Sequence, residues 1–143
     1  MDPSNVTIIL PALNEEAAIG TILASLRSSL PESEIIVIDD GSIDHTAQVA
    51  REHDVTVISH SYQRGYGAAL KTGIRASTKE CILCCDADGQ HRIDDALSII
   101  EHFENHDLIV GARTSESHAP LLRRPGKFIL SKFANTLSGA RIP

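Results

Sequence analysis

The chain has 143 residues, of which 42% are hydrophobic and 22% charged, and its formal net charge at pH 7 is −6. This length fits one domain with a buried core, and the composition excludes a disordered chain, a collagen-like repeat and a disulfide scaffold. No apolar run in the sequence is long enough to span a bilayer. Aromatic residues make up only 3% and Trp is absent, which argues against a stacking platform for nucleic acid.

Runs of buried-strand character alternate with amphipathic helices along the chain. Aliphatic and β-branched runs predict strands at 6–10, 34–38, 55–58, 81–85 and 108–110. Hydrophobic residues at helical spacing predict helices at 15–29, 44–53, 68–76, 93–103 and 126–138. We expect Asn14 to cap the first helix and Asp44 the second. Because strands and helices alternate, the predicted fold class is α/β, a mainly parallel sheet with helices on both faces.

Charge divides the chain into two regions. Residues 1–112 contain 7 Lys and Arg against 18 Asp and Glu, whereas residues 113–143 contain 6 against 1. Such an asymmetry suggests different roles for the two regions, although chance variation of surface charge is the alternative. We therefore predict a core of residues 1–112 and a basic segment, residues 113–143.

The three cysteines lie within five residues, at Cys81, Cys84 and Cys85. An odd number in one predicted strand is no disulfide framework, and a zinc site needs further ligands at suitable spacing. We expect cysteines buried in the core of a protein from a reducing compartment, the cytoplasm. Residues 1–5 also lack the pattern of a signal peptide.

Acidic side chains follow three of the predicted strands, at the edge where open α/β sheets bind ligands. Glu15 follows the first strand, Asp39 and Asp40 follow the second, and Asp86 and Asp88 follow the fourth. Crowded carboxylates raise each other's pKa unless a cation neutralises them, and oxygen ligands suit Mg²⁺ or Mn²⁺. An isolated Asp-x-Asp pair is a weak signal, because a capping or solvated turn has the same pattern.

Six segments in order make a more specific pattern, which resembles family 2 glycosyltransferases. They are residues 9–16, 37–46, 64–69 with Gly73, 86–91, 111–113 and 122–135. The last two are similar to the polyprenyl-phosphate branch of that family, which includes dolichyl-phosphate mannose synthase. Residues 11–15 contain no glycine, so a dinucleotide-binding Rossmann domain is disfavoured.

The resemblance implies a GT-A fold and a nucleotide-sugar donor, either GDP-mannose or a UDP-sugar. It places Pro11, Leu13 and Glu15 against the nucleoside. It makes Asp40 the acceptor of a base N–H, with Asp39 beside it.

The resemblance also implies a divalent cation, Mg²⁺ or Mn²⁺, on the donor pyrophosphate. Its ligands would be Asp86, Asp88 and Gln90. The cation would stabilise the charge that builds on the leaving phosphate, as a Lewis acid. The residues expected to act in catalysis are Asp88, Arg113 and Arg123, and Lys127 is expected to bind donor phosphate with them.

The implied acceptor is a polyprenyl phosphate, which is already an anionic nucleophile and needs no strong general base. One in-line displacement would then invert the anomeric centre. Family members continue into an Asp-x-x-x-Gly-Phe-Arg-like segment that this sequence lacks, so we expect the N-terminal portion of such an enzyme, truncated at its C-terminal side. The alternative is a donor-binding module without turnover. We further expect the segment 113–143 to contact the cytoplasmic face of a membrane, and its last helix to allow self-association.

Overall fold

The computed structural model describes residues 2–87, 93–102 and 107–111 of the chain. The chain divides into two units, Met1–Val110 and Gly111–Pro143, and all the described helices and strands belong to the first. The expected segment 126–138 lies outside the described residues.

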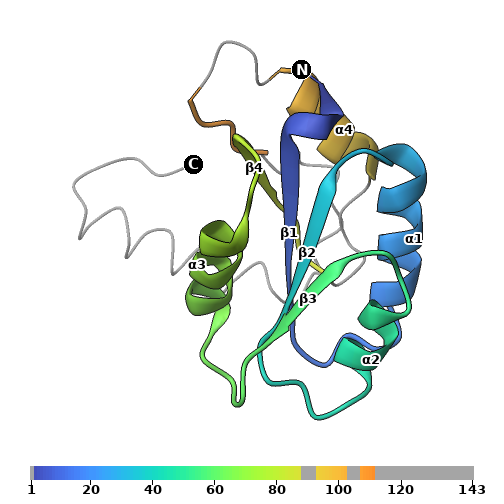
Figure 1. The fold of residues 1–143 in the computed structure, drawn as a ribbon, viewed down its shortest axis with the longest axis vertical. Coiled ribbons are helices and arrows are strands. Elements are labelled where there is room, and N and C mark those ends of the chain that lie inside the picture. The colour runs from blue at the N-terminus through green and yellow to red at the C-terminus, as the bar shows by residue number, and fades with distance from the viewer. Residues whose placement is uncertain (1, 88–92, 103–106, 112–143) are drawn as a thin grey trace, which may run out of the picture. The chain divides into compact units, whose positions relative to one another are not determined.

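Four parallel strands form the described sheet, in the order β3-β2-β1-β4 (Figure 1). The strands are β1 (Val6–Ala12), β2 (Glu34–Asp39), β3 (Thr56–Ser59) and β4 (Cys81–Cys84). The helices are η1 (Pro3–Asn5), a 3-10 turn, then α1 (Ile19–Ser29), α2 (Thr46–Arg51), α3 (Tyr66–Ala76) and α4 (Ile93–Glu101). The predicted parallel α/β sheet is confirmed.

Helices cover both faces of this sheet. Figure 1 shows α1 and α2 on one face and α3 on the other. The two faces have separate cores because successive strand side chains point in opposite directions. Ile8 and Leu10 of β1 pack in the cluster that contains the buried residues of α1, whereas Ile9 packs with Ala69 of α3. All seven residues of β1 are buried, which explains its uninterrupted apolar sequence.

Gly73 allows α3 to approach β1 closely. A Cβ atom at this position would lie 2.4 Å from Cγ2 of Ile9, a distance that real Cβ atoms do not tolerate. The glycine therefore allows α3 to lie this near to the sheet.

The first helix starts later than predicted, and Asn14 is not its cap. α1 begins at Ile19, after a turn in which the Ile19 N–H donates to the Glu15 carbonyl. Asn14 has a positive φ of 56°, and its Oδ1 accepts from the backbone N–H of Ile43, 29 residues away. The Asn14 side chain bonds to this distant segment and is therefore not available to cap α1.

The second helix is also shorter than predicted. α2 spans Thr46–Arg51 with His45 at its N-cap position. Asp44 lies one residue earlier, and its Oδ1 accepts from the Thr46 N–H at 3.0 Å. The expected aspartate therefore supports the first turn of the helix from outside the cap position.

Two further predictions about the strands are wrong. Residues 107–111 contain no strand, and Leu108 and Val110 are 78% and 77% exposed. A strand needs a hydrogen-bonded neighbour and cover for its side chains, and the described part of the chain supplies neither there. Cys81 is buried as expected, but Cys84 is exposed and Cys85 only half-buried.

Candidate functional site

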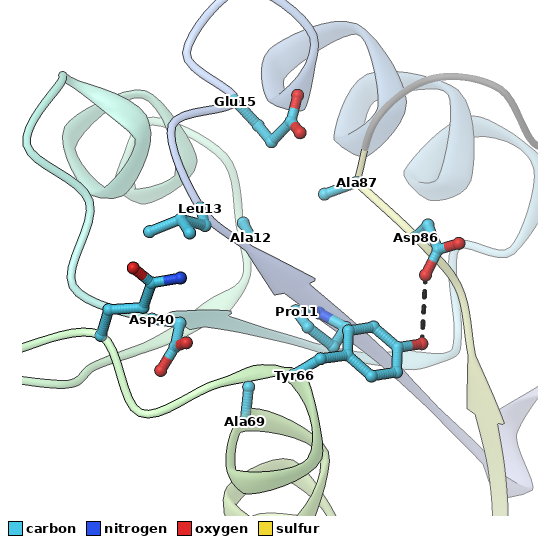
Figure 2. A pocket seen from close by; sticks show the side chains of 10 residues that line it. Pro11, Ala12, Leu13, Glu15, Asp40, Tyr66, Ala69, Asp86 and Ala87 are labelled. Atoms are coloured by element: carbon cyan, nitrogen blue, oxygen red, sulfur yellow. Dashed lines mark hydrogen bonds between the residues drawn. The ribbon is translucent and has the colours of Figure 1, made fainter.

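A cleft of about 300 Å³ opens at the carboxyl ends of β1, β2 and β4 (Figure 2). Parallel pairing brings these ends together, since Ala12 of β1 is in register with Asp39 of β2 and the Cys85 N–H donates to the Ile9 carbonyl. The first turn of α3 closes another side. The lining residues are Pro11, Ala12, Leu13, Glu15, Asp40, Gln63, Tyr66, Ala69, Asp86 and Ala87. A concave site at this edge is where open α/β sheets bind ligands.

The cleft brings together five residues that the sequence analysis singled out. These are Pro11, Leu13, Glu15, Asp40 and Asp86. Figure 2 shows the Asp40 and Asp86 carboxylates on opposite sides of the cleft. The predicted residues Asp88, Gln90, Arg113, Arg123 and Lys127 lie outside the described residues.

The Asp40 carboxylate of the cleft is buried and accepts three hydrogen bonds. It is only 4% exposed. Its Oδ1 accepts from Nδ1 of His60 at 2.6 Å and from the Arg64 N–H at 2.9 Å, and its Oδ2 accepts from the Gly65 N–H at 2.7 Å. Burial by itself raises the pKa of Asp40, but these three hydrogen bonds outweigh it, so the pKa lies below its usual value. Asp40 is therefore held as a carboxylate in a fixed orientation.

Asp39 has a different task, because it is buried beside the cleft and does not line it. Its Oδ1 accepts from the Ser42 N–H at 3.0 Å, which tightens the turn after β2. Gly41 in that turn has φ +80°, and a Cβ there would lie 2.5 Å from the carbonyl carbon of Tyr62. Glycine is therefore required for the turn to pass under the loop that carries Gln63 into the cleft.

The loop after β1 is held by the loop after β2. The Glu15 N–H donates to Oγ1 of Thr46 at 2.7 Å, and the Glu16 N–H donates to Oδ2 of Asp44 at 3.2 Å. In the opposite direction, Oε2 of Glu16 accepts from the His45 N–H at 2.9 Å. The polar residues of the segment 42–46 thus fix the backbone that presents Glu15 to the cleft, a role the spacing of the motif did not reveal.

Tyr66, the first residue of α3, bridges to Asp86 across the cleft. Its hydroxyl donates to Oδ1 of Asp86 at 3.1 Å (Figure 2). Burial, this hydrogen bond and the Asp86 charge raise the pKa of Tyr66 to about 12, so the hydroxyl keeps its proton at neutral pH. The bond orients the carboxylate that the sequence predicts as a metal ligand.

Five lining residues were not among the predicted site residues: Ala12, Gln63, Tyr66, Ala69 and Ala87. The available signal was the glycine-rich segment 64–67, which precedes a helix that begins at the carboxyl edge of the sheet. That segment was singled out, but nothing in its spacing showed which side chains reach the cleft.

The described part of the cleft is compatible with a divalent cation. Asp86 presents carboxylate oxygen there, and Glu15 lines the same cleft. Together with Asp88 and Gln90, which follow in the sequence, the donor set contains only hard oxygen ligands of the type that Mg²⁺ and Mn²⁺ prefer. Among the residues described, no three His, Cys, Asp or Glu side chains cluster as a ready-made metal site.

Comparison with known families decides what kind of domain carries this cleft. The model of glycosyl transferase family 2 matches residues 7–141. The chain belongs to glycosyl transferase family 2. A relative from Methanococcus voltae, named UDP-N-acetylglucosamine--dolichyl-phosphate N-acetylglucosaminyltransferase, is 28% identical over 94% of this chain and 63% of its own length. The chain spans about three fifths of the length of this relative and of other curated relatives that it matches over most of its own length.

Solved structures of GT-A glycosyltransferases share the fold of the family 2 chain. Glucosyl-3-phosphoglycerate synthase from Mycobacterium tuberculosis, in complex with Mn²⁺, UDP and phosphoglyceric acid, has a TM-score of 0.53 and 29% identity, covering 58% of this chain and 32% of its own. The mannosyltransferase PcManGT from Pyrobaculum calidifontis, in complex with GDP-Man and Mn²⁺, has a TM-score of 0.55 and 29% identity, covering 61% and 29%. Within the described residues of this chain, no helix has the length and hydrophobicity needed to cross a membrane.

Proposed function

We propose that the chain binds a nucleoside diphosphate sugar in the cleft and serves to transfer the sugar to a polyprenyl phosphate. One observation carries the proposal: five residues expected to bind the donor, from three strand ends, line one cleft at the carboxyl edge of the sheet. The names of the relatives add support, because one acts on dolichyl phosphate and two neighbours were solved with UDP or GDP-Man and Mn²⁺.

The nucleoside would lie at the end of the cleft formed by β1 and β2. Pro11 and Leu13 offer apolar contact, and Glu15 lines the same wall. Asp40, kept ionised and oriented, would accept a hydrogen bond from a base N–H, with Asp39 holding the turn next to it. A base without a donor at that place forgoes one hydrogen bond to a charged acceptor, which is worth about 1.5–3 kcal/mol.

The pyrophosphate would lie at the opposite end, near Asp86. Asp86, Asp88 and Gln90 would hold Mg²⁺ or Mn²⁺, which as a Lewis acid stabilises the charge on the departing diphosphate. Tyr66 would keep the Asp86 carboxylate aimed at that place. Basic side chains expected to neutralise the remaining phosphate charge are Arg113, Arg123 and Lys127.

The acceptor would approach from the side of the basic segment 113–143. Its 6 Lys and Arg against 1 acidic residue suit an anionic lipid phosphate or an anionic membrane surface. A phosphorylated acceptor is itself the nucleophile, so the sugar passes to its oxygen in one displacement while the nucleoside diphosphate leaves. The peripheral contact at the cytoplasmic face and self-association through the last predicted helix belong to the same proposal.

Calorimetry with UDP and GDP sugars, in Mn²⁺ and then in EDTA, tests donor binding. We expect binding of one nucleotide class that weakens at least about tenfold in EDTA or in Asp88→Asn, or about 1.4 kcal/mol. Asp107→Asn, which changes an exposed carboxylate far along the chain, is the matched control. Equal affinity in EDTA and Mn²⁺ would remove the metal from the mechanism.

Turnover separates the transferase from a donor-binding module. We expect release of nucleoside diphosphate when polyprenyl phosphate is added, and no release with 3-phosphoglycerate. If nucleoside diphosphate is released with 3-phosphoglycerate and not with polyprenyl phosphate, the lipid acceptor is wrong and the acceptor resembles that of the structural neighbour. Tight donor binding without release in either case would favour the binding module.

A further inference from the structure

His60 connects three elements around the cleft without lining it. It follows β3 directly, and its side chain is 5% exposed. Nδ1 lies 2.6 Å from Oδ1 of Asp40, and Nε2 lies 2.9 Å from Oγ1 of Thr72 on α3. The Thr72 hydroxyl in turn lies 3.0 Å from the Ala68 carbonyl. A buried polar chain therefore runs from the end of β2 through His60 to α3.

We propose that His60 is a positioning residue that aims the Asp40 carboxylate and thereby sets which nucleobase the cleft accepts. This inference rests on the proposed function, in which Asp40 accepts from the base. His60 contacts Asp40 and Thr72, and its effect on the ligand is exerted through Asp40.

The donors around Asp40 come from two different parts of the fold. The Arg64 and Gly65 N–H groups belong to the backbone that leads into α3. His60 is tied to the sheet, because its own N–H donates to the Asp39 carbonyl at 2.8 Å. It is the side-chain donor that links the Asp40 carboxylate to the sheet, and the charge on Asp40 strengthens this bond as it does the two backbone bonds.

The ring orientation follows from its two partners. A carboxylate with a lowered pKa only accepts, so Nδ1 must carry a proton and donate to Asp40. The Thr72 hydroxyl has a single proton, so Nε2 either accepts that proton in the neutral ring, in place of the Ala68 carbonyl, or donates to Oγ1 in the protonated ring while the hydroxyl donates to Ala68. In both states Thr72 prevents the ring from turning, and Nδ1 keeps donating to Asp40.

Two amide variants separate the two ends of the ring. In His60→Asn the side-chain amide N–H occupies roughly the place of Nδ1, so the bond to Asp40 is retained and the bond to Thr72 is lost. In His60→Gln the longer amide reaches the place of Nε2, so the bond to Thr72 is retained and the bond to Asp40 is lost. Both replace a buried imidazole by a buried amide, which makes them matched controls for general damage to the fold.

The measurement is the ratio of the UDP and GDP dissociation constants in Mn²⁺, with urea unfolding of each variant beside it. We expect His60→Asn to keep the wild-type ratio within about twofold and His60→Gln to move it toward one by about fivefold, or about 1 kcal/mol, the size of one hydrogen bond. An unchanged ratio in His60→Gln, or an equal loss in both variants that follows their loss of stability, would overturn the positioning role. Asp40→Ala distinguishes failure of the positioning role from failure of the proposed function. If the wild type binds neither nucleotide, or if Asp40→Ala keeps the wild-type ratio, the proposed function itself fails.

Discussion

Two adjacent aspartates allow a sharp test of how Asp40 is held. Asp39 and Asp40 are 5% and 4% exposed, so replacement by Asn alters side-chain size and burial equally at the two positions. The Asp40 carboxylate accepts three hydrogen bonds on its two oxygens, whereas Asp39 accepts from the Ser42 N–H on one oxygen. Toward the described residues, therefore, Asp40 uses both of its oxygens as acceptors and Asp39 uses one.

The magnitudes follow from this count. An amide in place of Asp40 can keep one oxygen toward His60 and Arg64, but its NH₂ group then faces the Gly65 N–H, which loses its partner. Losing a charge-assisted bond and leaving a buried donor unpaired costs about 3 kcal/mol in total. An amide at Asp39 keeps its one acceptor and loses only the charge assistance, about 1 kcal/mol.

Urea unfolding followed by far-ultraviolet circular dichroism measures both losses, a suitable signal for a chain without Trp. We expect Asp40→Asn to lose about 2 kcal/mol more of the free energy of unfolding than Asp39→Asn. Equal losses in the two variants would refute the hydrogen-bond count, and with it the view that Asp40 is held by its surroundings.

Three further predictions concern the turn at Gly41, the pH dependence of stability and the Tyr66 hydroxyl. Gly41→Ala should cost about 2 kcal/mol or more in urea unfolding, because φ is +80° and the new Cβ would lie 2.5 Å from a backbone carbon, whereas Gly67→Ala, which meets open space in α3, should gain about 0.5–1 kcal/mol. Since the pKa of Asp40 is lowered on folding, its contribution to stability is present above the unfolded pKa and is lost as the pH falls through the folded one. As the pH falls below about 5, the free energy of unfolding of Asp40→Asn should therefore decrease less steeply than that of the wild type. A parallel pH dependence in the two proteins would contradict this. Tyr66→Phe removes the donor to Asp86 and should weaken Mn²⁺-dependent nucleotide binding about tenfold, with binding in EDTA unchanged; an equal change in EDTA would show that the hydroxyl does not act through the metal.

Local sequence determined the strands and the edge at which the chemistry lies. The runs at 6–10, 34–38 and 81–85 are apolar and β-branched, and each ends in polar residues. Because parallel strands place all their carboxyl ends at one edge, these polar residues had to converge there. That is why Pro11 and Asp86, 75 positions apart in the sequence, could be predicted to share a site, and why they line the same cleft.

Tertiary structure decided what each of these residues does. Asn14 is a residue type that favours helix caps, but it contacts Ile43 and lies in the left-handed region, and α1 starts only at Ile19. Leu108 and Val110 belong to an apolar run that predicts a strand, yet both are exposed. Local propensity is worth tenths of a kcal/mol per residue, so a single long-range hydrogen bond or a missing neighbour is enough to override it.

The roles of His60 and Tyr66 depended entirely on the fold. His60 lies in none of the predicted site positions, and Tyr66 lies in the segment 64–69 without a role predicted for it; their partners Asp40 and Asp86 are each 20 residues away along the chain. Such pairs form only when the sheet register and the close packing of α3 on β1 have been set. The sequence therefore determined which residue types gather at the carboxyl edge, because strand direction fixes where strand ends lie. Only the tertiary structure decided which carboxylate is buried, oriented and ionised, because those properties come from donors that the fold brings in from distant segments.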